Sequence, residues 1–165
     1  MIFLHHYPTS PWAEVVRLSL GLKGLTWQSV EVQSTCPKPD LEALTGGYVR
    51  VPVLQIGADI HCDTAAIVEA LEAFQPEPTL FPRGDETRAL AATAQGPPFF
   101  AAVGAAFEHA PADGMDDFWA DRERRFGMKR DALAAMTPML LKAFEAHLDT
   151  LEARLAGGSP WLEGD

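Results

Sequence analysis

Two short stretches of this chain place hydroxyl and carboxyl side chains at the predicted start of a helix. Ser10 precedes Pro11, which is a hydroxyl at the N-cap followed by proline at the first helical position. Asp63 and Thr64 precede residues 65–74, where Ile67, Leu71 and Phe74 recur at a spacing typical of a helix. A helix start offers unpaired backbone N–H groups and a partial positive charge, which together attract anions. Both stretches therefore predict anion binding.

A proline stands just upstream of the second stretch. Residues 51–56 form a short apolar run that predicts a buried strand, and a tight turn and a second short strand at 60–62 follow it. Proline cannot donate to a sheet ladder, so Pro52 belongs at the first position of its strand, at an edge or at a bulge. The peptide bond before it can be cis. The sequence thus predicts a β-hairpin that begins at Pro52 and leads into the helix at Asp63–Thr64.

The combination of Val51-Pro52, a hairpin and Asp63-Thr64 resembles the cytosolic glutathione transferases. The resemblance implies a thioredoxin-like domain in which Pro52 is cis and the backbone of Val51 pairs with the cysteinyl part of glutathione. It implies that Thr64 holds the γ-glutamyl carboxylate and that Asp63 attracts the ammonium group of the same residue. Arg50 would pair with the glycyl carboxylate, or it is simply a solvated arginine. The sequence departs from the family at 46–49, where Gly-Gly-Tyr-Val replaces an Asn-Pro-x-Gly run, which leaves the contacts of the cysteinylglycine end open.

Ser10 is the predicted catalytic hydroxyl. Residues 10–18 resemble the family's first strand–helix junction, where a Ser, Cys or Tyr faces the sulfur of glutathione. A free thiol has a pKa of about 8.5, and lowering it by two units needs about 2.7 kcal/mol of differential interaction. A donated hydrogen bond and a helix dipole supply that. The alternative is that Ser10 only caps its own helix. Tyr7 is the runner-up donor, with strand-end packing as its alternative role. The lack of a cysteine here disfavours disulfide-reductase chemistry.

The resemblance also implies a small apolar electrophile as second substrate. Trp12 and Phe107 are the predicted walls of its site, from a wider set of candidate aromatic residues: Phe99, Phe100, Phe118 and Trp119. Aromatic residues at helical spacing more often form core, which is the competing interpretation.

Composition excludes several other classes of function. The chain has 165 residues with a formal net charge of −10, so it lacks the basic footprint that nucleic acids and anionic membranes require. No apolar run approaches the length of a spanning helix, and the first residues do not resemble a signal peptide. Two cysteines make no disulfide framework, and neither Cys-x-x-Cys nor His-Glu-x-x-His occurs, so we expect no metal and a reducing cytoplasm.

The predicted fold class is an α/β thioredoxin-like domain of βαβ-ββα order over residues 1–76, followed by an all-α domain. A proline-rich linker spans 77–84, and the helical domain over 85–165 covers only about half of the family's second domain. Within it, Thr137-Pro138 predicts a helix start. The acidic and basic run at 113–125 predicts a solvated helix face.

We therefore expect a glutathione transferase that ionises the thiol of glutathione and adds it to an apolar electrophile, in a homodimer. Two alternatives remain open. One is a glutathione-transferase-like binding or scaffold module without catalysis, which the altered segment at 46–49 favours. The other is a glutathione-dependent isomerase or dehalogenase, which would use the same thiolate.

Overall fold

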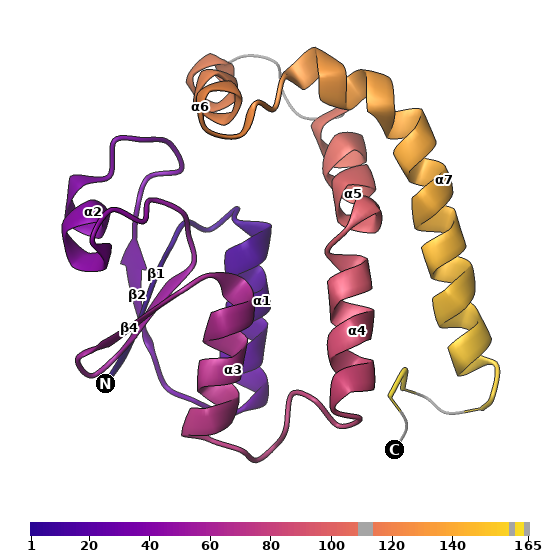
Figure 1. Ribbon diagram of the computed structural model, residues 1–165, viewed down its shortest axis with the longest axis horizontal. Coiled ribbons are helices and arrows are strands. Elements are labelled where there is room, and N and C mark those ends of the chain that lie inside the picture. Colours follow the sequence, from indigo (N-terminus) through magenta and orange to yellow (C-terminus); the bar gives the residue numbers. More distant parts are fainter. Residues whose placement is uncertain (109–113, 159–160, 164–165) are drawn as a thin grey trace. The chain divides into compact units, whose positions relative to one another are not determined.

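The computed structural model describes residues 1–108, 114–158 and 161–163 (Figure 1). The chain divides into two compact units, Met1–Leu80 and Phe81–Asp165, and each is described by itself.

Unit 1 is a four-stranded sheet with helices on both sides. Its elements in chain order are β1 (Ile2–His6), α1 (Pro11–Leu22), β2 (Gln28–Glu31), α2 (Pro39–Thr45), β3 (Val53–Ile56), β4 (Asp59–Cys62) and α3 (Thr64–Phe74). The strand order is β2-β1-β3-β4; β1 pairs parallel with β2, and β3 pairs antiparallel with both β1 and β4. The predicted thioredoxin-like fold class is confirmed.

Strand alternation explains where the core of unit 1 lies. Leu4 on β1 and Leu54 on β3 are paired and point to the same face, where both are fully buried. Helices α1 and α3 cover that face with apolar side chains spaced three to four residues apart, which are Val16, Leu20, Ile67 and Leu71. Helix α2 lies on the other side of the sheet (Figure 1).

Unit 2 is helical throughout its described residues. Its helices are α4 (Asp85–Ala94), α5 (Pro97–Glu108), α6 (Asp116–Phe126) and α7 (Arg130–Leu155). Helices α5 and α7 pack closely, because Gly104 has no side chain: a Cβ there would lie 2.3 Å from the Oγ1 of Thr137. Ala101, Leu133 and Leu140 form the small buried core between these helices.

Two expectations for unit 2 are wrong. Thr137-Pro138 does not begin a helix, since α7 runs through it and the Thr137 hydroxyl donates to the Leu133 carbonyl at 2.9 Å. The run at 113–125 is not simply a solvated face, since Asp121 is 1% exposed. Its carboxylate accepts hydrogen bonds from arginines on its own helix, which are Arg122, Arg124 and Arg125, and these bonds compensate its burial. Asp113 lies outside the described residues.

A buried lysine fixes the end of unit 1. The side chain of Lys23 is 0% exposed, and its ammonium donates to the carbonyls of Gln75 and Pro78 at 2.6 and 2.9 Å and pairs with Glu72 at 2.8 Å. Burial alone would raise the pKa of Glu72, but hydrogen bonds from Lys23, Thr79 and the backbone N–H of Leu80 lower it from 4.5 to about 2. The chain that leaves α3 is thereby tied to the end of α1.

We predict that Glu72→Gln lowers the free energy of unfolding of unit 1 by about 3 kcal/mol, because it leaves a buried ammonium without its carboxylate. The folded pKa of Glu72 lies below its unfolded value, so the pair stabilises above about pH 4.5, and this contribution disappears as the pH falls toward about 2. Urea unfolding at several pH values measures both effects.

The matched control is Glu42→Gln, since the side chain of Glu42 is exposed on α2. Equal stability losses in the two variants at pH 7 would contradict a special role for the Lys23–Glu72 pair.

Candidate functional site

The strand register brings the candidate site residues to one end of the sheet. His5 on β1 pairs with Val53 on β3, and Val53 pairs with Cys62 on β4. Tyr7 directly follows β1, Val51 stands two residues before β3, and Thr64 is the first residue of α3. The three segments that carry the candidate site residues therefore lie at the same end of the sheet, although they come from separate parts of the sequence.

The bond between Val51 and Pro52 is cis, as the sequence analysis expected. Pro52 is fully buried at the start of β3, while Val51 is half-buried. Among the residues that the structure describes, neither the backbone N–H nor the carbonyl of Val51 has a hydrogen-bond partner. An extended peptide placed beside Val51 would find one free donor and one free acceptor there.

Helix α3 begins beside this free backbone. Asp63 adopts a positive φ of 77°, and its carboxylate accepts a hydrogen bond from the N–H of Ala65 at 3.1 Å. Thr64 is buried, at 7% exposure. Within the described part of the chain, the N–H groups of Thr64 and Ala66 have no acceptor. The helix start thus offers two backbone donors and a hydroxyl to an anion, next to a carboxylate that attracts a cation.

Ser10 occupies the corresponding position at the start of α1. Its hydroxyl oxygen accepts a hydrogen bond from the N–H of Ala13 at 3.2 Å, and its backbone N–H donates to the carbonyl of Tyr7 at 3.1 Å. The residue is 1% exposed. Ser10 is therefore a helix cap in this structure, which was the alternative interpretation of its role. Its hydroxyl proton has no acceptor among the described residues.

An arginine supports the segment that carries Ser10. The guanidinium of Arg17 donates to the carbonyl of Pro8 at 3.0 Å and lies 2.8 Å from Nδ1 of His6. Glu14 pairs with the same guanidinium. Burial and the charge of Arg17 lower the pKa of His6, although nearby carboxylates oppose this. A neutral His6 accepts from Arg17 and keeps the turn between β1 and α1 in place.

Two further residues of unit 1, Arg50 and Tyr7, were predicted to belong to the site. Arg50 is exposed, and its guanidinium carbon lies 5.2 Å from the centroid of the Tyr48 ring. Tyr7 is half-buried, with the ammonium of Lys38 5.8 Å from its ring. Tyr48 was not among the predicted site residues. The signal that identifies it is an aromatic residue within the segment that departs from the family pattern.

Neither thiol chemistry of the chain itself nor metal binding finds support in the geometry. Burial, and to a lesser extent the charge of Asp63, raises the pKa of Cys62, which keeps it protonated. No group of three His, Cys, Asp or Glu side chains in the described ranges is arranged to hold a metal ion. None of the described helices combines the length and apolar character that crossing a membrane would require.

The two predicted walls of an apolar site, Trp12 and Phe107, belong to different units. Trp12 is half-buried in unit 1. Phe107 belongs to unit 2, where its ring packs against Trp119 at 4.8 Å and Phe118 at 5.6 Å between centroids. Phe107 is thus part of an aromatic cluster at the margin of the unit 2 core.

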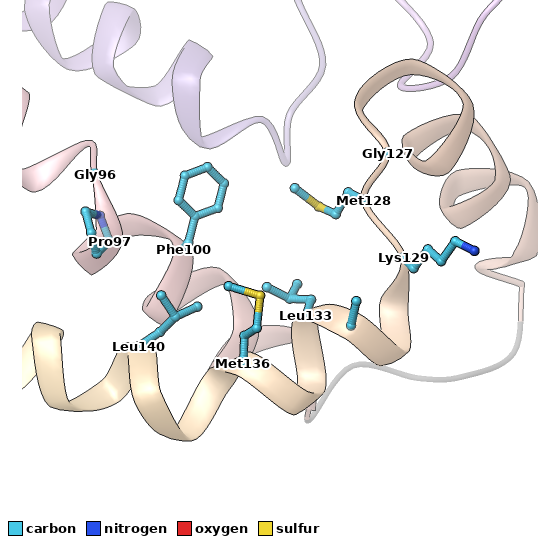
Figure 2. Close-up of a pocket in the computed structure, with 10 residues that line it drawn as sticks. Gly96, Pro97, Phe100, Gly127, Met128, Lys129, Leu133, Met136 and Leu140 are labelled. Atoms are coloured by element: carbon cyan, nitrogen blue, oxygen red, sulfur yellow. The ribbon is translucent and has the colours of Figure 1, made fainter.

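A different apolar pocket exists within unit 2 (Figure 2). It has a volume of about 450 Å³, which is in the range of small-molecule sites. Phe100, Met128 and Met136 project toward the same space, whereas the Lys129 ammonium points away from it (Figure 2) and pairs with Glu123 at 3.2 Å. Phe100 was among the wider set of aromatic candidates, but the methionines were not considered.

Comparisons with known proteins agree with this architecture. Residues 4–79 match the family model described as "Glutathione S-transferase, N-terminal domain". A GST-like protein from Pseudomonas syringae is 37% identical, with a TM-score of 0.58 over 90% of this chain and 49% of its own. FtsZ-localized protein A of Caulobacter vibrioides is 31% identical over 91 residues, which are 53% of this chain and 40% of that protein.

A second solved structure shares the fold at lower sequence identity. It is a glutathione transferase homologue from Sulfitobacter with bound glutathione, 20% identical, with a TM-score of 0.66 over 100% of this chain and 74% of its own. The chain spans less than half of the length of the Pseudomonas and Caulobacter relatives.

Proposed function

Since residues 4–79 match the model of the glutathione S-transferase N-terminal domain, we propose that this chain is a glutathione-binding module that recognises the peptide without turning it over. Glutathione would lie along the backbone of Val51 with its γ-glutamyl end at the start of α3. Thr64 would hold the carboxylate of that end, Asp63 its ammonium group, and Arg50 the glycyl carboxylate. This conclusion adopts the scaffold alternative of the sequence analysis as the main function.

One observation carries the binding proposal. The free N–H and carbonyl of Val51 lie at the same end of the β3–β4 hairpin as the free N–H groups of Thr64 and Ala66. Extended peptides bind to such free strand edges through main-chain hydrogen bonds, and helix starts bind carboxylates. Glutathione carries an extended backbone and a carboxylate at matching ends.

The state of Ser10 supports recognition over catalysis. A hydroxyl that acts on a thiol must touch the sulfur, but Ser10 is 1% exposed and already caps α1. The Caulobacter relative is named for its localisation with FtsZ and not for a reaction, which supports a role other than catalysis for this chain.

We predict that Thr64→Ala weakens glutathione binding about tenfold, because it removes a hydrogen bond to a charged group. Isothermal titration of the purified chain with glutathione up to millimolar concentration measures this. Thr93→Ala on α4 is the matched control, since it makes the same substitution in unit 2, where the Thr93 hydroxyl donates to the Ala89 carbonyl of its own helix. Absence of glutathione binding by the folded parent chain would refute the module, and unchanged affinity in Thr64→Ala would refute the assignment at α3.

A second function is favoured by one observation, which is that the hydroxyl proton of Ser10 has no acceptor within the described ranges. In this proposal the chain is a cytoplasmic, homodimeric glutathione transferase in which Ser10 donates to the thiolate. Pocket-lining residues of unit 2 would then accept an apolar electrophile. An isomerase or dehalogenase would use the same thiolate on a different partner.

For this second function, we predict that Ser10→Ala lowers kcat about a hundredfold while glutathione affinity changes little, because the lost donor acts on the sulfur. Loss of the cap also lowers the free energy of unfolding by about 1 kcal/mol. Conjugation of a chromogenic aryl halide, followed by absorbance, gives the rate.

The matched control is Ser19→Ala, because the Ser19 hydroxyl donates to the Val15 carbonyl within the same helix. If the parent chain shows no turnover, or if Ser10→Ala lowers kcat and glutathione affinity by the same factor, the catalytic role of Ser10 is refuted. Glutathione binding without catalysis then remains as the function.

A further inference from the structure

The segment that departs from the family pattern is held rigidly beside the candidate glutathione site. Gly46 and Gly47 have φ values of 71° and 112°, which suit glycine and end α2. The hydroxyl of Thr45 then donates to the carbonyl of Tyr48 at 2.8 Å. The backbone of Tyr48 is therefore fixed by the end of the helix before it.

Tyr48 lies beside Arg50, the residue that directly precedes Val51. The centroid of its ring is 5.2 Å from the guanidinium carbon of Arg50. Burial raises the pKa of Tyr48, although the charge of Arg50 opposes this, so the phenol stays neutral at physiological pH.

The guanidinium of Arg50 lies beside the ring of Tyr48. No ion pair of Arg50 occurs among the described residues, in a chain of net charge −10. An arginine held over an aromatic face keeps its N–H donors free for an anion. A carboxylate one residue beyond the cysteinyl position of an extended peptide lies about 3.3 Å further along, within the reach of a long side chain.

We propose that Tyr48 determines specificity at this site by holding Arg50 where it selects a thiol peptide with a carboxylate at its C-terminal end. This inference rests on the proposed function, because it concerns how the same site discriminates among ligands. Tyr48 is a positioning residue, because its ring acts on the ligand only through Arg50.

The test compares glutathione with its glycyl monoethyl ester, which keeps the peptide but lacks the terminal charge. The parent chain should bind the acid about tenfold more tightly than the ester, and Arg50→Met should remove this preference. Tyr48→Leu should reduce the preference about threefold, through a weaker affinity for the acid alone. Tyr48→Phe retains the ring and should retain the preference.

Controls separate positioning from general damage. Arg124→Met removes a cation that is 63% exposed in unit 2 and should leave the preference unchanged. Thermal melting of each variant checks that unit 1 is folded. Weakening of acid and ester by the same factor in Tyr48→Leu, or no change in either, would overturn the inference.

Binding of the two ligands to the parent chain tests the glutathione-binding module and the role of Tyr48 and Arg50 separately. If it binds both ligands with equal affinity, the binding module stands and the role of Tyr48 and Arg50 is refuted. If it binds neither ligand at millimolar concentration, the binding module is refuted together with this inference.

Discussion

The arrangement of unit 1 depends on the pairing of β3 with two neighbours at once. Leu54 is paired with Leu4 on one side and His61 on the other, and its side chain is fully buried. A slip of one residue would turn Leu54 away from α1 and α3 and expose it, so the register is strongly specified. The same register brings the segments that carry Tyr7, Val51 and Thr64 to one end of the sheet. The hydrophobic core thus determines which polar groups meet at the edge of the sheet.

Much of unit 1 could be predicted from the sequence because its signals are local. Each of three local patterns is enough to predict its own element. They are the proline after Ser10, the apolar run at 51–56 and the cap at Asp63–Thr64. The strand predicted at 51–56 was two residues too long, because β3 begins at Val53. The approach of the Arg50 guanidinium to the Tyr48 ring could not be predicted, because both residues lie in a loop, where no helix or strand period relates them.

In unit 2 the local signals were misleading for physical reasons. Thr137-Pro138 has the composition of a helix start, but the surrounding turns supply enough hydrogen bonds and packing to carry α7 through the proline. The sequence predicts that Asp121 lies on the surface. The structure buries it, because Arg124 and Arg125, three and four residues further along α6, donate hydrogen bonds to its carboxylate and compensate for the lost hydration. Sequence patterns of period 3.6 show which residues share a face but not which partner covers that face.

The buried ammonium of Lys23 has a consequence for handling unit 1 in isolation. The Pro78 carbonyl, which accepts from Lys23, and the backbone N–H of Leu80, which donates to Glu72, both lie past the end of α3. A fragment cut shortly after Phe74 would strand a positive charge in an apolar interior, and its poor yield would be mistaken for a lack of autonomous folding. Expression of the sheet as a separate piece therefore needs the chain through Leu80, although the last strand and helix finish earlier.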